Sequence, residues 1–341
     1  MSEEKSCCCN AARCGDESSI PVVPTDTRFE DILGAWKVRW GIHRMNYRIN
    51  PGLYAVGSPD NASPILVSAN YKLTFDSLRK ELSGLDCWLL ILDTKGVNVW
   101  CAAGKGTFGT AELINRIAKT GLGEIVSHRK LILPQLGAVG VSAHEVAEKT
   151  GFSVIYGPVR ANDINAFIHS GFQATEEMRT VQFTAWDRFI LTPVELVEAA
   201  KTSLSVFGVL FLLNIFAART FGLSDFIVYA GVVVTGTVIT PVFLPFIPGR
   251  AFAWKGWLTG LLWTAACVFF NGWLTPDNLL LGIGYLLVLP SFSAYLAMNF
   301  TGSSTYTSFS GVIKEMKISL PFIVSSSVLG IVLILIKSFI A

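Results

Sequence analysis

The chain has 341 residues, of which 51% are hydrophobic and only 15% charged, whereas a soluble domain carries roughly a quarter charged residues. Residues 1–200 hold 20 Lys/Arg and 22 Asp/Glu, and residues 201–341 hold 7 and 3. The net charge of +2 therefore combines −2 in the first part with +4 in the second. This asymmetry excludes a single soluble domain. The lack of a basic run or of an aromatic and basic stripe argues against a nucleic-acid partner.

The first part of the chain divides into a tail and a domain. Residues 1–27 are rich in Cys, Ser, Pro and Asp without periodicity, which predicts a flexible tail. We place the soluble domain at 28–195. Its short apolar runs predict strands at 53–56, 65–68, 88–92, 130–133, 154–156 and 180–184. Helical patterns lie at 75–82, 109–119, 143–149 and 162–168. This alternation predicts βαβ units, a mostly parallel sheet and an α/β fold.

Ligands of such sheets bind beyond the carboxyl ends of the strands. The four segments at these ends are small, polar or contain Gly and Pro, and they are 68–71, 93–96, 134–137 and 157–160. The sequence has no G-x-G-x-x-G after the first strand and no complete P-loop, which argues against nucleotide binding through those motifs. It also lacks a G-x-S-x-G elbow and an H-E-x-x-H zinc motif.

The second part, 196–341, predicts an all-α transmembrane domain. Five apolar runs are long enough to cross about 30 Å of hydrocarbon, at 202–218, 225–247, 256–273, 279–300 and 319–340. If these runs were buried helices of a soluble core, many charged residues would be needed on the outer faces that cover them. Residues 201–341 contain only ten charged residues, which is too few. No charge lies near a span centre, which favours an anchor over a transporter.

The orientation of these spans follows from the loops between them. Basic residues gather on one side, at Lys201, Arg250, Lys255, Lys314 and Lys317. The positive-inside rule then predicts an inner (cytoplasmic) membrane protein with its N-terminal domain in the cytoplasm and its C-terminus outside. Residues 1–16 contain no apolar h-region, so we expect no signal peptide. A hydroxyl-rich loop, 299–317, is expected on the cytoplasmic side.

The seven cysteines fall into distinct settings. Cys7, Cys8, Cys9 and Cys14 do not fit an iron–sulfur spacing, so they predict either a soft-metal capture site or an idle reduced tail. Cys87 and Cys267 fit packing in a strand and in a span. Cys101 stands in the small-residue segment 98–107, near the basic Lys105, a setting that favours a thiolate. The residues alone leave Cys101 open between a functional thiol and a core residue.

Residues 98–105, Asn-Val-Trp-Cys-Ala-Ala-Gly-Lys, resemble the signature of the mercury-methylating corrinoid proteins. These are membrane-bound relatives of the large subunit of the corrinoid iron–sulfur protein of acetyl-CoA metabolism. The resemblance extends through 133–137, 156–160, the five spans and 302–308, but not to the cysteines of the tail. One departure from the iron–sulfur relative is that this chain has no four-cysteine cluster motif.

The resemblance implies a Rossmann-like domain that binds a cobalamin-type corrinoid under a short cap helix. Cys101 would be the lower axial ligand of its cobalt and the catalytic residue. Asn98 and Trp100 would shape the cap helix, and Lys105 and Thr107 would steady its far end. With the strand ends, the implied cofactor site comprises Asn70, Tyr71, Asn98, Val99, Trp100, Cys101, Ala102, Lys105, Gly106, Thr107, Gln135, Leu136, Gly137, Ser142, Tyr156, Gly157, Pro158 and Arg160. The usual histidine ligand motif, D-x-H-x-x-G, is absent.

The activity that this resemblance implies is transfer of a methyl group from a methylcorrinoid to inorganic Hg(II), which makes the chain a methyltransferase. The implied partners are a ferredoxin-like electron donor with two [4Fe–4S] clusters and a methyltetrahydrofolate-type donor or its methyltransferase. Two alternatives stay open. One is a corrinoid methyl carrier for another acceptor in one-carbon metabolism. The other is a membrane-anchored protein that binds soft metals through Cys7 to Cys14.

Overall fold

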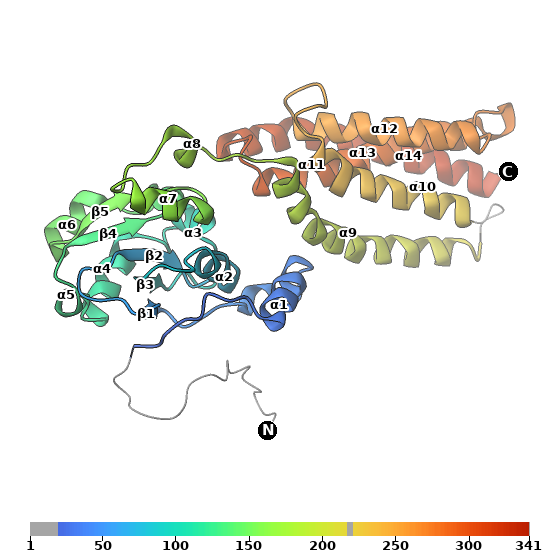
Figure 1. The fold of residues 1–341 in the computed structure, drawn as a ribbon. Helices are drawn as coiled ribbons and strands as arrows, with labels where there is room; N and C mark the ends of the chain where they lie inside the picture. Colours follow the sequence, from blue (N-terminus) through green and yellow to red (C-terminus); the bar gives the residue numbers. More distant parts are fainter. Residues whose placement is uncertain (1–19, 217–220, 341) are drawn as a thin grey trace. The chain divides into compact units, whose positions relative to one another are not determined.

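The computed structural model describes residues 20–216 and 221–340, and the chain divides into two compact units (Figure 1). Among the described residues, the first unit comprises 20–32 and 45–180, and the second comprises 33–44, 181–216 and 221–340. The division that we predicted after residue 195 lies inside one helix, α9 (Ala185–Leu213). The cysteines at positions 7, 8, 9 and 14 lie outside the described residues.

The first unit is built on a five-stranded sheet in the order β1-β3-β2-β4-β5, in which β1 is antiparallel to β3 and the other pairs are parallel. The strands are β1 (Gly52–Val56), β2 (Ile65–Ala69), β3 (Cys87–Leu92), β4 (Lys130–Leu133) and β5 (Ser153–Tyr156). All six residues of β3 and all five of β2 are buried, as expected of inner strands covered on both faces. The expected mostly parallel α/β sheet is confirmed.

Residues 21–23, part of the tail that we predicted, lie along β1. The backbone of Ala55 exchanges hydrogen bonds with this segment, because Val23 N donates to Ala55 O at 2.8 Å and Ala55 N donates to Pro21 O at 3.0 Å. Val23 is buried against the sheet. This segment therefore covers part of the exposed edge that β1 would otherwise present.

The strand predicted at 180–184 is wrong. These residues form an extended connection, and Thr184 ends it as the N-cap of α9, where its hydroxyl accepts a hydrogen bond from Asp187 N at 3.2 Å. Phe183 packs against Phe300 of the helical unit, with ring centroids 6.4 Å apart. Threonine favours strands by propensity, but here its hydroxyl satisfies the free amides of a helix start.

Helices cover both faces of the sheet, and the strand side chains alternate between two cores. In β3, Trp88, Leu90 and Leu92 face one core, while Cys87, Leu89 and Ile91 face the other. The helices of the unit are α1 (Phe29–Arg39), α2 (Lys72–Lys80), α3 (Val99–Lys105), α4 (Thr110–Lys119), α5 (Leu122–Ile125), α6 (Ala143–Thr150), α7 (Ile164–His169) and α8 (Glu176–Arg179). Part of α1 belongs by its contacts to the second unit. Residues of α3, α4 and α6 contribute to the first core, and residues of α2 and α7 to the second.

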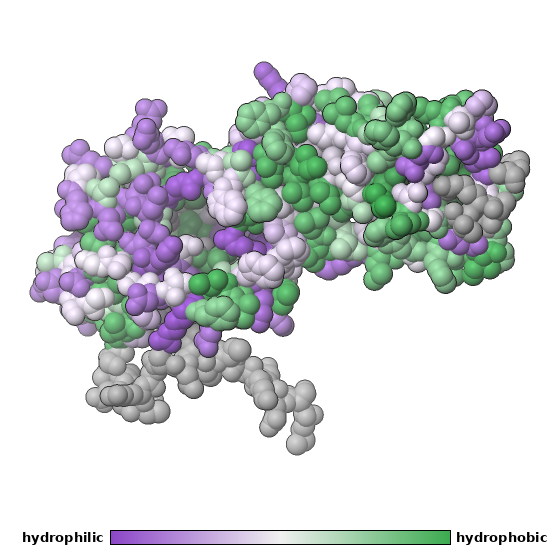
Figure 2. All heavy atoms as spheres, turned by 45° about the vertical axis from the view of Figure 1, so that its right-hand side comes forward, coloured by the Kyte–Doolittle hydropathy of each residue, from purple (hydrophilic) through white to green (hydrophobic). Residues whose placement is uncertain are grey.

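The second unit is a bundle of antiparallel helices. After α9 it contains α10 (Leu223–Val234), α11 (Thr240–Val242), α12 (Phe252–Phe270), α13 (Leu279–Asn299) and α14 (Phe309–Ile340), with a π-helical turn at Thr235–Ile239. Figure 2 shows that hydrophobic side chains dominate the visible surface of this bundle, whereas hydrophilic ones dominate that of the α/β unit.

Four stretches of described residues are long and apolar enough to cross a membrane: Ala185–Leu213, Leu223–Val242, Pro276–Ser303 and Ser310–Phe339. The third span that we predicted corresponds to α12, which is not among the four, so the number of five spans is not confirmed. Glycines allow α12 to pack closely on α13. A β-carbon at Gly260 would lie 2.5 Å from Ser293 Cβ, and one at Gly256 would lie 2.7 Å from Ser293 O.

Candidate functional site at the carboxyl edge of the sheet

Helix α3 follows β3 and carries Cys101. It has only seven residues, and both of its ends are capped. At its start, Asn98 Oδ1 accepts a hydrogen bond from Cys101 N at 2.9 Å. At its end, Gly106 adopts a left-handed conformation with φ of 79°, which glycine tolerates without strain. The caps fix the two turns of helix between them, and with them the position of Cys101.

The two faces of α3 have different environments. Val99, Ala102 and Ala103 are buried in the first core. Trp100, Gly104 and Lys105 are exposed on the other side, and Cys101 is half-buried one helical turn before Lys105. Cys101 is therefore accessible in a way that a core thiol is not.

Cys87 provides the contrast within the same unit. Its side chain is fully buried in β3, and burial, with a further contribution from the charge of Asp86, raises the pKa of this thiol to about 12. Such a thiol remains protonated and unreactive at neutral pH. The expectation that Cys87 packs in the core is confirmed.

Close backbone packing seats α3 on the loop after β4. This loop begins with a 3₁₀ turn, Gln135–Gly137, that packs against α3. A β-carbon at Gly140 would lie 2.2 Å from Phe108 O and 3.0 Å from Ala103 Cα, and one at Gly137 would lie 2.5 Å from the buried Phe108 ring. Only residues without a β-carbon allow the loop and the helix to approach this closely.

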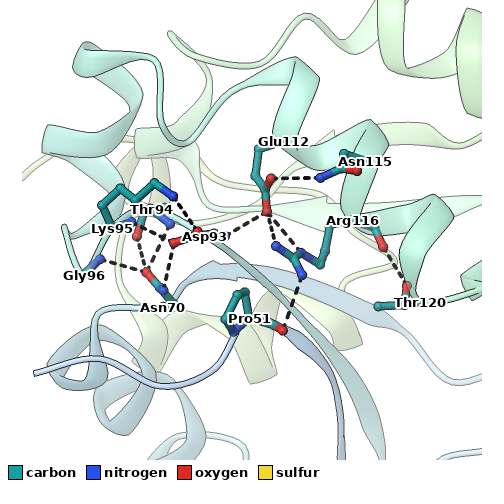
Figure 3. Close-up of polar contacts among 10 residues, drawn as sticks. All are labelled: Pro51, Asn70, Asp93, Thr94, Lys95, Gly96, Glu112, Asn115, Arg116 and Thr120. Atoms are coloured by element: carbon teal, nitrogen blue, oxygen red, sulfur yellow. Dashed lines mark hydrogen bonds and ion pairs between the residues drawn. The ribbon is translucent and has the colours of Figure 1, made fainter.

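Asn70, the first residue after β2, organises the loop that leads into α3 (Figure 3). Its side chain is 1% exposed. Its Oδ1 accepts hydrogen bonds from Thr94 Oγ1 at 2.9 Å, from Gly96 N at 3.0 Å and from Thr94 N at 3.1 Å. Its Nδ2 donates to Asp93 Oδ1 at 3.2 Å. Asn70, which we predicted to bind a cofactor, thus uses its side chain to hold residues 93–96.

A carboxylate from α4 joins the same network (Figure 3). Glu112 Oε1 accepts a hydrogen bond from Asp93 N at 2.9 Å and two from Arg116, at 2.6 and 3.0 Å. Burial alone would raise the pKa of Glu112, but the hydrogen bonds from Asp93 N and Arg116 outweigh it and lower this pKa. The hydrogen bond and charge of Lys95 likewise lower the pKa of Asp93. Both carboxylates are therefore ionised at neutral pH, and that of Glu112 ties α4 to the end of β3.

The other predicted site residues occupy different environments. Tyr71, Gly157 and Pro158 are buried, whereas Leu136 and Arg160 are half-buried. Tyr156 donates its hydroxyl proton to Val141 O at 2.7 Å, and burial raises its pKa. Ser142 caps α6, and Thr107 N donates to Ala102 O at 2.9 Å.

Gln135 stands out among these residues. Its backbone N donates to Pro158 O at 3.4 Å, which joins the loops after β4 and β5. Its Oε1 is buried, and within the described part of the chain it has no hydrogen-bond partner. An acceptor left in this state costs about 1–3 kcal/mol unless something binds it.

The structure therefore brings together α3, the ends of β2 and β3, and the turn after β4, with the loop after β5 beside that turn. Ser142, the N-cap of α6, is linked to the start of α4, because its backbone N donates to Thr110 Oγ1 at 2.8 Å. The sequence placed Thr94 at this edge, within 93–96, but it assigned no role to Glu112, Phe108 or Gly140. In the structure Ala69 pairs with Leu92 in the register of β2 and β3, which brings the polar residues after the two strands together.

The described residues contain no cluster of three or more His, Cys, Asp or Glu side chains suited to a metal ion. A cavity of about 220 Å³ lies at the opposite edge of the sheet, near the starts of β2 and β4. Most of its lining is apolar, and its His128 is engaged with Ser63 O at 2.9 Å and with Lys130 N at 3.2 Å. The edge that carries an accessible thiol and an unpaired buried acceptor among the described residues is the carboxyl edge under α3.

Comparison with known proteins matches residues 32–168 to the family of the CO dehydrogenase/acetyl-CoA synthase delta subunit. Over 126 residues, 36% of this chain, the sequence is 32% identical to the acetyl-CoA decarbonylase/synthase complex subunit gamma of Methanocaldococcus jannaschii. Over 155 residues, 44% of this chain, it is 30% identical to the corrinoid/iron-sulfur protein large subunit of Moorella thermoacetica. These matches cover 25% and 34% of the two relatives, so the chain spans about a quarter to a third of their length.

Proposed function

We propose that this chain is a membrane-anchored, corrinoid-dependent methyltransferase in which the Cys101 thiolate would bind the cobalt of the corrinoid. The observation that carries the proposal is the half-buried Cys101 on a doubly capped helix over the carboxyl edge of the sheet. Support comes from the similarity of this unit to a corrinoid/iron-sulfur protein large subunit and to acetyl-CoA decarbonylase/synthase subunits. Both names point to one-carbon metabolism.

The residues at this edge fit a corrinoid. The outward face of α3 offers a soft sulfur donor at Cys101 and open space at Gly104, where an added β-carbon would meet nothing within 4 Å. Gln135 Oε1 is a buried acceptor that finds no partner among the described residues, and an amide-rich macrocycle carries donors that match it. Cys101, Gln135 and the backbone around Gly104 would hold the group.

When bound, a corrinoid supplies a cobalt atom that carries a methyl group, and a thiolate ligand favours its release to an electrophile. The chain contributes the position of that thiolate. Asn98 holds the amide of Cys101, and the Asn70 network holds the loop before it. Lys105, one turn further on, places a cation on the same face. Positioning by rigid elements is the contribution that such a site needs from the protein.

We propose inorganic Hg(II) as the methyl acceptor, because a thiophilic electrophile suits a methyl group released with its electron pair. The second candidate is an acceptor in one-carbon metabolism, favoured by the names of the relatives. Comparing the yield of methylmercury with methyl transfer to a thiol or to a folate distinguishes the two. A soft-metal-binding function of Cys7 to Cys14 predicts that deletion of residues 1–15 abolishes activity, whereas the corrinoid mechanism predicts that most activity remains.

The proposed partners are a ferredoxin-like protein with two [4Fe–4S] clusters, as reductant, and a methyltetrahydrofolate-type donor or its methyltransferase. We propose that the helical unit anchors the chain in the inner membrane, with the α/β unit in the cytoplasm and the C-terminus outside. The segment 299–317 is not one loop, because a 3₁₀ turn follows α13 at Phe300–Ser303 and α14 begins at Phe309. It also offers less free surface for docking than its composition suggests. Thr301 and Ser304 are buried, and Tyr306 contacts Phe183 and Arg188.

The decisive experiment compares the absorption spectra of three purified full-length proteins: the wild type, Cys101→Ala and Cys267→Ala. Cys267→Ala is the control, because it removes a thiol from the helical unit. The wild type should hold about one corrinoid per chain, with a spectrum that reports sulfur ligation. Cys101→Ala should lose that ligation signature and the formation of methylmercury while remaining folded, and Cys267→Ala should keep both. A preparation that takes up no corrinoid contradicts the proposal, and retained activity in Cys101→Ala removes the axial role.

A further inference from the structure

Helix α1 presents a large apolar stripe on its exposed face. Phe29, Ile32, Leu33 and Trp36 are 76%, 55%, 39% and 61% exposed. Their spacing of i, i+3, i+4 and i+7 places them on one face of the helix. Trp40, just after the helix, adds a second indole whose ring centroid lies 5.7 Å from that of Trp36. An exposed patch of this kind marks an interaction surface.

The opposite face of α1 is the one engaged with the protein. Asp31 forms ion pairs with Lys72 at 2.6 Å and with Arg79 at 2.7 Å. Val38 is 1% exposed. At about 100° per residue, Asp31 and Val38 lie within about 20° of each other and about 160–180° from Phe29. The protein therefore holds the helix by this face and leaves the apolar stripe outward.

The charges around the stripe suit an anionic surface. Lys37 flanks it at about 80° from Phe29, and the exposed Glu30 lies on the same side at about 100°. Residues 28–48 contain five basic and two acidic residues, and one of the acidic two, Asp31, is already paired within the protein. An apolar face rich in Trp and Phe, in a segment with an excess of basic side chains, is the pattern of a helix that lies in the headgroup region of a bilayer.

The contacts of α1 associate it with the apolar bundle. Residues 33–44 group with the helical unit. A β-carbon built on Gly41 would lie 3.9 Å from Val197 Cγ1, and Arg44 attracts the carboxylate of Glu195. Both partners belong to α9, a helix long and apolar enough to cross a membrane.

Aromatic side chains mark the same end of the bundle. Trp186 and Phe189 stack at the start of α9, with ring centroids 5.6 Å apart, and Trp254 and Trp257 stack at the start of α12, 5.4 Å apart. In Figure 1 the starts of α9 and α12 lie at one end of the bundle. Tryptophan gathers at the membrane–water interface, so this end of the bundle fits a membrane boundary.

We propose that α1 is an interfacial helix that inserts Phe29, Ile32, Leu33 and Trp36 into an anionic lipid leaflet beside α9. The proposal rests on the membrane anchoring in the proposed function and does not depend on corrinoid chemistry. The bound surface is the lipid bilayer itself, with anionic headgroups contacting Lys37. The consequence is that the α/β unit has a second attachment to the membrane surface besides its chain connection to α9.

The test uses the full chain in nanodiscs of phosphatidylglycerol and phosphatidylcholine, with a benzophenone-bearing phenylalanine in place of Trp36. The same replacement at Val22, an apolar side chain that is 67% exposed and lies outside α1, is the control. Irradiation and mass spectrometry should give about tenfold more lipid adduct at position 36 than at position 22. Adducts to protein at position 36, or equal lipid adducts at both positions, overturn the proposal.

A second variant tests the physical cause. In the wild type, we expect the amides of residues 29–39 to exchange more slowly in anionic nanodiscs than in neutral detergent. Trp36→Glu places a charge in the stripe, so it should remove this slow exchange. Val22→Glu should leave that protection intact. If the chain is stably inserted but α1 gains no protection, only this inference fails. If the chain does not insert at all, the anchoring in the proposed function fails with it.

Discussion

Asn70 and Asp93 lie side by side at the ends of two neighbouring parallel strands, and Asn70 Nδ2 donates to Asp93 Oδ1 at 3.2 Å. The Asn70 carbonyl oxygen, in the same amide, accepts three further hydrogen bonds from Thr94 and Gly96. One buried amide thus determines how the chain leaves β3 before it enters α3. The position of Cys101 depends on this loop, although Asn70 is distant from it in the sequence.

Asn70→Ala should destabilise the α/β unit by about 1–3 kcal/mol, because it leaves the buried amide of Gly96 without its acceptor. Hydrogen exchange of the intact chain should show faster exchange in residues 93–98. Asn115→Ala is the matched control, since Asn115 is exposed and makes one contact with Glu112 at 3.4 Å. It should change stability by less than about 0.5 kcal/mol. Equal effects of the two variants would contradict the role assigned to Asn70.

Gly140→Ala should displace α3, because the added methyl group meets backbone at 2.2 Å from Phe108 O and 3.0 Å from Ala103 Cα. Neither atom is the end of a flexible side chain, so we expect a loss of about 1–3 kcal/mol. Gly104→Ala makes the same change inside α3, where nothing lies within 4 Å, and should stabilise the helix by up to about 1 kcal/mol. Thermal unfolding of both variants checks whether stability falls for Gly140→Ala and rises for Gly104→Ala.

Asp31 should make stability dependent on pH in the acid range. Burial would raise its pKa, but hydrogen bonds from Lys72 and from Arg28 N, with the charges of Lys72 and Arg79, lower it overall. A carboxyl group whose pKa is lower in the folded than in the unfolded protein stabilises the fold at pH values above the unfolded pKa, which is about 4. This stability is lost as the pH falls through the pKa of the folded state. Asp31→Asn should therefore be about 1–3 kcal/mol less stable at pH 7 and lose less on acidification.

Unfolding measured from pH 7 down to about pH 3 checks this prediction. The exchange rates of amides in β2 and β3 give a signal specific to the α/β unit. Glu124→Gln is the control, because Glu124 is an exposed carboxylate on α5. If Asp31→Asn keeps the full acid sensitivity of the wild type, other carboxylates cause it.

Gly260→Ala should loosen the packing of α12 on α13, since its β-carbon would lie 2.5 Å from Ser293 Cβ and 3.1 Å from Pro290 Cα. Small residues allow apolar helices to approach closely where no hydrophobic effect drives them together. Gly208→Ala in α9 is the control, because that glycine has no neighbour within 4 Å. The thermal midpoint in detergent should fall for Gly260→Ala and not for Gly208→Ala.

The strands show what a local pattern can predict. Residues 87–92, Cys-Trp-Leu-Leu-Ile-Leu, form an inner strand because an unbroken apolar run is stable only when buried on both faces. Helix α3 is different, since Val-Trp-Cys-Ala-Ala-Gly-Lys is too short for a periodic signal. Its signals are Asn98 before it and Gly106 after it, the residue types that begin and end helices. We anticipated a helix there only from a resemblance.

The organisation of the site required the folded chain. Asn70, Thr94 and Gly96 meet only because β2 and β3 are adjacent and parallel, and no local pattern reports the three hydrogen bonds that Asn70 accepts. The close approach of Gly140 to Phe108 and Ala103 is likewise a tertiary contact. Helix α1 was missed although its apolar spacing is helical, and the strand expected at 180–184 was wrong because Thr184 caps α9.

The two caps and the inward face of α3 have a consequence for how this protein can change. Asn98, Gly106 and the buried Val99, Ala102 and Ala103 set where the helix lies. Trp100, Gly104 and Lys105 face outward, so substitutions there leave the folding determinants of the helix untouched. The residues that position the helix are therefore different from those that surround the thiol, so the chemistry around Cys101 and the placement of α3 depend on separate sets of side chains.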